Sequence, residues 1–83
     1  MGDKIRKQLY ETAQDINLIA SKIHHTAQCI GVISAQIGTK AIYDEDVTTL
    51  IETLRNLRRD LSKFVSELDE AIDSIDSHIG LKD

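Results

Sequence analysis

Two adjacent histidines and a run of cations are the side chains whose types and spacing could support chemistry. His24 and His25 lie in the first half of the chain, and an accessible imidazole nitrogen can take up a proton or attack a phosphoryl group. The second half carries four cations close together: Arg55, Arg58, Arg59 and Lys63. Guanidinium groups bind phosphate and carboxylate through paired hydrogen bonds. Both sets are therefore candidate ligand-binding or partner-binding residues.

The elements that hold these residues are predicted by two heptad repeats. Lettering each heptad a to g, the a position is apolar throughout: Leu9, Ile16, Ile23, Ile30 and Ile37, then Val47, Leu54, Leu61, Leu68 and Ile75. The chain contains no proline that would interrupt either run. This pattern predicts an all-α fold in which two long helices pack together as in a coiled coil.

We expect the first helix to span residues 3–41 and the second to span about 45–79, with a turn at 42–45. Asp3 and Asp44 are the predicted N-caps, and Gly80 is predicted at the C′ position after the second helix. Because so short a connection makes the helices antiparallel, residues 1–83 should form one helical-hairpin domain.

A hairpin of this size needs reinforcement, because two helices share only one contact strip. Cores in chains of this length rarely contribute more than about 3–5 kcal/mol. Cys29 is the only cysteine, so no disulfide can form within the chain, and no Cys/His cluster has metal-site spacing. We therefore expect a homo-oligomer, either a four-helix-bundle dimer or a larger helical assembly.

The first helix carries a small residue at every e position: Ala13, Ala20, Ala27, Ser34 and Ala41. Small residues at a repeated position let two helix backbones approach closely and leave room for large side chains opposite. We expect Leu57, Leu61 and Phe64 of the second helix to fill that room, within the hairpin.

A longer uncharged segment indicates a second buried surface on the first helix. Residues 23–39 include no Lys, Arg, Asp or Glu, whereas a solvated helix face normally carries charges. The predicted oligomer interface consists of Ala27, Gly31, Val32, Ser34, Ala35 and Gly38. The alternative is a weakly polar face that remains in solvent.

Charges are sorted into blocks along the chain. Three cations begin the first helix, and five carboxylates occupy residues 67–76. We expect an antiparallel hairpin to set these blocks side by side, which favours that orientation. If two copies of the second helix met antiparallel near Phe64, Arg59 would face Asp69 and Arg55 would face Asp73. This two-fold arrangement is one hypothesis for the basic run.

The basic run has two other interpretations. Arg58 occupies an e position beside the core and is expected to face Thr26, Gln28 and Cys29 of the first helix. There its guanidinium could hold a phosphate or a nucleotide-like ligand at a seam between subunits. The commoner use of such a run is a solvated basic face.

The segment around the second histidine resembles a known signalling family. The run His25-Thr26-Ala27-Gln28-Cys29-Ile30-Gly31 is similar to the His-x-Leu-Lys-Gly run of histidine phosphotransfer domains. The resemblance covers these seven residues, with Gln28 in place of the lysine and Cys29 in place of the glycine. It implies a four-helix bundle whose exposed histidine accepts a phosphoryl group from an aspartyl phosphate.

The remaining composition narrows the choice of function. His78 falls at a core position near the open end of the hairpin, where a partly buried neutral imidazole is expected. The net charge of −4 argues against a nucleic-acid partner, and no apolar run approaches the roughly 18 residues that span a bilayer. We expect no cofactor, no bound metal, no enzyme activity and a cytoplasmic location.

These observations predict a binding protein. We expect a non-enzymatic, homo-oligomeric helical bundle that acts as a regulator, inhibitor or adaptor through contacts with another protein. The first alternative is an oligomer that binds a small anionic ligand or a nucleotide through arginines at subunit seams. The second is a histidine phosphotransfer protein that uses His24 or His25.

Overall fold

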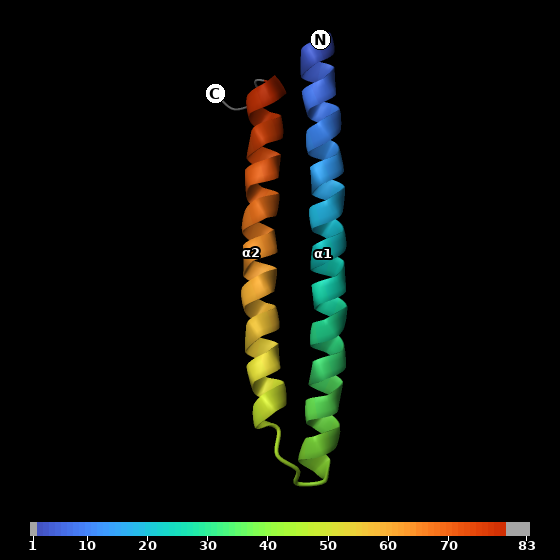
Figure 1. Cartoon of the computed structure of the whole chain (residues 1–83), viewed down its shortest axis with the longest axis vertical. Coiled ribbons are helices and arrows are strands. Elements are labelled where there is room, and N and C mark those ends of the chain that lie inside the picture. Colours follow the sequence, from blue (N-terminus) through green and yellow to red (C-terminus); the bar gives the residue numbers. More distant parts are fainter. Residues whose placement is uncertain (1, 80–83) are drawn as a thin grey trace.

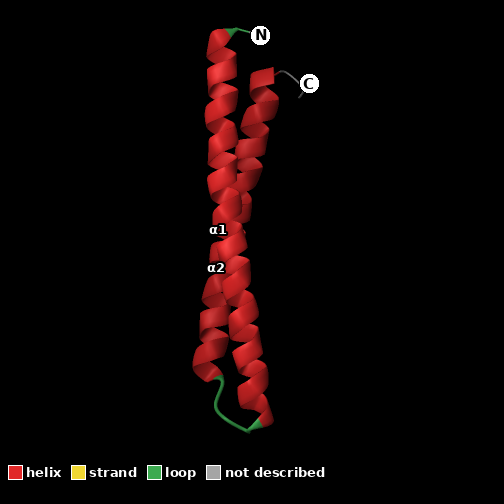
Figure 2. Ribbon diagram, turned by 90° about the vertical axis from the view of Figure 1, so that its right-hand side faces the viewer, coloured by secondary structure: helices red, strands yellow, loops and turns green. Residues whose placement is uncertain are grey.

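The fold consists of two antiparallel helices packed side by side. The computed structural model describes residues 2–79, with side chains described as far as residue 77. Helix α1 spans Asp3–Ile42 and helix α2 spans Thr48–Ile79. Figure 1 shows α2 returning beside α1 after the turn, and Figure 2 shows that the two helices cross near their middle. The predicted all-α helical hairpin is confirmed.

The helices pack through their a and d rows, as the heptads predict. On both helices the side chains of these rows lose solvent contact, whereas the e row of each helix is exposed. The Lys22 ammonium lies 5.6 Å from the centroid of the Phe64 ring, so these two residues are level with each other. Because the helices are antiparallel, one turn toward the C-terminus of α1 corresponds to one turn toward the N-terminus of α2. Thr26 is therefore about level with Leu61.

The seam, which is the strip of a and d residues where the two helices meet, is almost nowhere fully buried. Thr26, with 6% of its surface exposed, is the one buried residue among those described, and no described apolar side chain is buried to that degree. Two helices touch along a single strip, so each isoleucine or leucine of the seam is covered from one side only. Much of the hydrophobic free energy that these side chains could contribute is therefore not recovered within one chain.

The turn ends α1 with a Schellman motif. Asp44 has a φ of 55°, in the left-handed region that residues with a β-carbon rarely occupy. The N–H of Glu45 donates to the Lys40 carbonyl at 2.9 Å, and the N–H of Asp44 donates to the Ala41 carbonyl at 3.2 Å. The predicted role of Asp44 as the N-cap of α2 is therefore wrong, because this residue closes α1.

Helix α2 begins at residue 48, later than predicted, and the side chain of Asp46 caps its first turn. The Asp46 carboxylate accepts a hydrogen bond from the Thr48 hydroxyl at 2.6 Å and another from the Thr48 backbone N–H at 3.0 Å. These two bonds favour the ionised form and lower the pKa of Asp46, with the hydroxyl bond as the larger cause. The Schellman motif and this cap together hold residues 43–47 outside both helices.

The start of α1 also differs from the prediction. Gly2 is the N-cap and Asp3 is the first helical residue, where its carboxylate pairs with Arg6 one turn further on. Figure 1 shows α1 extending past the described end of α2, so the cations at its start overhang the acidic block. Arg6 accordingly pairs within its own helix. The predictions for Gly80 and for the His78 side chain lie outside the described residues.

The left-handed backbone at Asp44 predicts a stabilising substitution. Asp44→Gly removes the steric cost of the β-carbon, and we expect it to raise the free energy of unfolding by up to about 1 kcal/mol. Asp44→Val, with a branched β-carbon, should lower that free energy. Urea unfolding followed by circular dichroism measures both variants. The same stability for glycine and valine would contradict this turn geometry.

The cap at Asp46 predicts a stability difference that depends on pH. Because the folded pKa lies below the ordinary 3.8, the contribution of this carboxylate is complete above pH 3.8 and is lost as the pH falls through the lowered pKa. We expect Asp46→Ala to reduce the melting temperature clearly at pH 7 and much less at pH 2. Asp46→Asn, which keeps an acceptor oxygen, should fall between the two at pH 7. Equal reductions at both pH values would contradict the assignment.

Candidate functional site

The hairpin has two broad faces, and each runs along a molecule that measures 62 × 20 × 14 Å. One face carries the e and b rows of both helices, and we call it the e face. The other carries the g and c rows, and we call it the g face. A hollow in each shows which rows share a face: Ile30, Leu54, Arg55 and Arg58 line the first, and Asp15, Leu18, Lys22, Glu67, Glu70 and Ser74 help to line the second.

The e face carries a row of exposed apolar side chains on α2. Ile51, Val65 and Ile72 keep 36%, 43% and 45% of their surface in solvent, and together with Arg58 they make up the described e row of this helix. Across the seam the e row of α1 from Ala13 to Ala41 is small and uncharged. Exposed apolar side chains repeated along one helix face form a candidate interaction surface. The sequence reasoning missed this row, although the heptad lettering of the second half identifies it.

The small e-row residues of α1 do not pack inside the hairpin, so that prediction is wrong. Ala13, Ala20 and Ala27 are exposed, as are the other members of the row. The reason is geometric. Contact with α2 is centred between the a and d rows, which turns the e row of α1 toward the side of the seam. Leu57, Leu61 and Phe64 meet the a and d rows instead.

The six residues predicted as a second interface are all exposed in the single chain. Ala27 and Ser34 belong to the e row, Gly31 and Gly38 to the neighbouring b row, and Ala35 to the f row beside it. Val32 belongs to the c row and turns toward the g face. A β-carbon added at Gly31 or Gly38 would meet nothing within 4 Å. Burial of this surface by another chain stays a prediction.

The four cations of the basic run lie on two different sides of α2. Arg55 and Arg58 line the e-face hollow, which has a volume of about 290 Å³, whereas Arg59 and Lys63 are exposed in the f and c rows on the outside of α2. The prediction that Arg58 faces Thr26, Gln28 and Cys29 is wrong, because Arg58 lies beside Ile30. The a row of α1 borders the e face, and the g row that holds Cys29 borders the opposite one.

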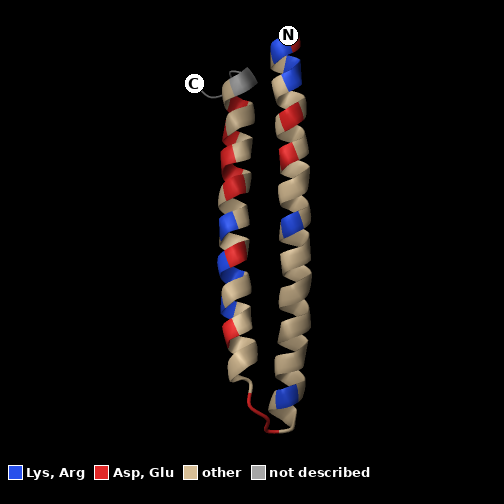
Figure 3. Ribbon diagram, in the orientation of Figure 1, with Lys and Arg blue, Asp and Glu red and all other residues tan. Residues whose placement is uncertain are grey.

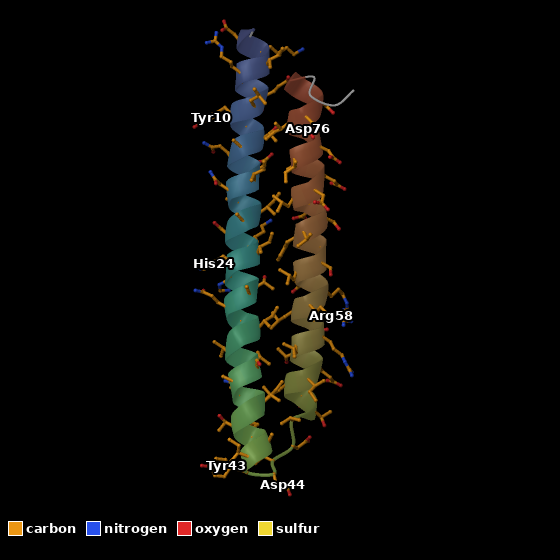
Figure 4. The ribbon with its side chains drawn as sticks, turned by 180° about the vertical axis from the view of Figure 1, so that it is seen from behind. Tyr10, His24, Tyr43, Asp44, Arg58 and Asp76 are labelled. Atoms are coloured by element: carbon orange, nitrogen blue, oxygen red, sulfur yellow. The ribbon has the colours of Figure 1, made fainter. Side chains whose placement is uncertain are left out.

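Both candidate histidines are exposed, and they do not lie beside the arginines. Figure 4 shows His24 projecting from α1 away from α2, while Arg58 projects from the far side of α2. The Nε2 atom of His25 lies 3.9 Å from the Cys29 sulfur, one turn along the same helix. The part of the chain that the structure describes contains no group of three or more His, Cys, Asp or Glu side chains able to hold a metal ion.

Charge is distributed unevenly over the two helices. Figure 3 shows a long uncharged stretch on α1, cations in the middle of α2, and carboxylates toward its far end. Within residues 2–79 no helix is long and apolar enough to cross a membrane. No protein-family model, curated protein or solved structure matches the chain. The functional interpretation therefore rests on the geometry of the two faces.

Proposed function

We propose that this protein is a homo-oligomeric helical bundle that acts by binding another protein, as a regulator, inhibitor or adaptor, and that it is not an enzyme. One observation carries the proposal: no described apolar side chain is buried, while Ile51, Val65 and Ile72 form an exposed row on the e face. A chain of this length recovers little hydrophobic free energy alone. Self-association buries the apolar surface that a single chain leaves in solvent.

Two surfaces take different roles in this proposal. The e face joins copies of the chain, because it is the broad face with the apolar row on α2 and with no Lys, Arg, Asp or Glu in the e and b rows of α1 between residues 10 and 41. The c row of α1, which belongs to the g face, stays accessible in such a bundle, and we call it the outer side of α1. It presents Leu18 and Val32, which keep 63% and 58% of their surface in solvent, and we assign the partner protein to this side.

The arrangement of the polar groups supports a binding role over catalysis. A catalytic site brings a nucleophile or base within hydrogen-bond reach of groups that orient it. Here His24 and Arg58 project away from each other at the two edges of the e face, and the carboxylates of α2 are spread along the helix.

A second candidate function is favoured by the e-face hollow. Two arginines, Arg55 and Arg58, line this hollow together with the apolar side chains of Ile30 and Leu54. This combination suits an anionic ligand with a small apolar body.

Calorimetric titration with AMP and with inorganic pyrophosphate tests this second function. It predicts saturable binding that Arg58→Ala abolishes and that Arg59→Ala, on the outer side of α2, leaves intact. Failure of the unmodified protein to bind either compound would contradict it.

The assembly role of the e face predicts opposite outcomes for two matched substitutions. Val65→Asp places a carboxylate in the apolar row, whereas Val32→Asp makes the same change on the outer side of α1. Light scattering should give a mass of at least two chains for the unmodified protein and for Val32→Asp. For Val65→Asp it should give one chain, with loss of helical circular dichroism. A single-chain mass for the unmodified protein would contradict the proposal.

The partner role of the outer side of α1 predicts a complementary result. A tagged copy of the chain in its native cells should retain one protein that the Val32→Asp variant, still assembled, fails to retain. Retention of the same protein by both forms would remove the outer side of α1 as its binding surface.

A further inference from the structure

The e face of α2 carries opposite charges on either side of its middle. Arg58 belongs to the e row and Asp69 to the b row, and both side chains are exposed. Among described residues Arg58 forms no ion pair. The stretch between them presents Val65 at its centre. A surface with this layout is complementary to itself when it is reversed.

We propose that the e face is covered by a second copy of the chain turned end for end. Helix α1 then packs on α1 and α2 on α2, and the two turns lie at opposite ends of a four-helix bundle. This inference rests on the proposed function, since it specifies the geometry of that assembly. A two-fold axis level with Phe64 places Arg58 of each copy opposite Asp69 of the other. Arg59, the residue paired with Asp69 in the sequence hypothesis, lies in the outer f row instead.

Charge complementarity selects this orientation over the other two-fold arrangement. With both turns at the same end, α2 of one copy would pack on α1 of the other, and Arg58 would face the segment 23–39. That segment contains no carboxylate. A guanidinium enclosed beside isoleucine and alanine without a counter-charge is strongly unfavourable. End-for-end packing gives the same guanidinium a carboxylate partner.

Helix α1 gives an independent check on the same axis. Because Lys22 lies over Phe64, an axis level with Phe64 passes α1 close to residues 23 and 24. End-for-end pairing about that level brings Ala20 against Ala27 of the second copy, and Ala13 against Ser34. Small residues then meet small residues, so the two α1 backbones can approach closely. The exposed e row of α1, which has no role inside one hairpin, acquires one in this dimer.

The ends and the area of the face agree with the same arrangement. Arg6, in the e row at the start of α1, becomes level with the acidic turn of the second copy, which contains Asp44 and Glu45. The broad face is 62 Å long and 20 Å wide, dimensions that leave room for the about 800 Å² per partner that a stable interface buries. The face is therefore large enough to hold a dimer together.

Cysteine cross-linking distinguishes the orientations, with Cys29→Ser as the background. His24→Cys lies near the proposed axis, so mild oxidation should convert most of the protein to a covalent dimer. His25→Cys, equally exposed but in the outward c row, is the matched control and should remain largely uncross-linked. Efficient cross-linking of His24→Cys only when it is mixed with a Ser62→Cys variant would overturn the end-for-end orientation, because that pair is adjacent only when the turns share an end.

Charge reversal tests the ion pair itself. Arg58→Asp and Asp69→Arg should each weaken dimerisation by about tenfold or more, measured by analytical ultracentrifugation. The double variant recreates the pair and should restore dimerisation to near the original value, which also shows that the single variants can fold. Arg59→Asp, on the outer row, should have little effect. Additive losses in the double variant would overturn the pairing.

The two proposals fail in different ways. A monomeric unmodified protein contradicts the homo-oligomer of the proposed function. A dimer that cross-links through His25→Cys, or that ignores the charge reversals, leaves the oligomer standing and overturns only its orientation.

Discussion

The structure depends on one constraint: two helices that pack only on each other share a single strip of contact. Every apolar residue of that strip is covered on one side and open on the other, and Thr26 alone is buried among the described residues. Hydrophobic stabilisation scales with the apolar area removed from water, so a hairpin of this kind is incompletely stabilised. In the proposed assembly a second copy of the chain covers the seam from the other direction.

The proposed assembly accounts for the contrast between the two helices. Helix α2 places Ile51, Val65 and Ile72 beside its seam residues, and helix α1 places alanine and serine at the corresponding row. Large residues on one helix and small residues on the other give a broad face that a partner can approach closely. The outer side of α1 lies apart from this face, so assembly and partner binding can be carried by different rows of the same helix.

The heptad repeats were sufficient to predict the hairpin because period and handedness follow from the apolar rows alone. They did not predict the turn, since the choice between Asp44 and Asp46 as the cap depends on which backbone adopts the left-handed conformation. A sequence window holding three neighbouring carboxylates does not distinguish these positions. The e row of α1 was misassigned for a related reason. Its small residues fit any close helix contact, and the pattern does not say which helix makes it.

Folding coupled to association is the central claim, and the concentration dependence of thermal unfolding tests it most directly. If the seam must be covered by another copy, the melting temperature followed by circular dichroism should rise with protein concentration. The rise should be on the order of 10 °C between 1 and 100 μM chain, because dissociation accompanies unfolding. A melting temperature that stays constant across this range, with full helicity at the lowest concentration, would show that the hairpin folds alone and would contradict the claim.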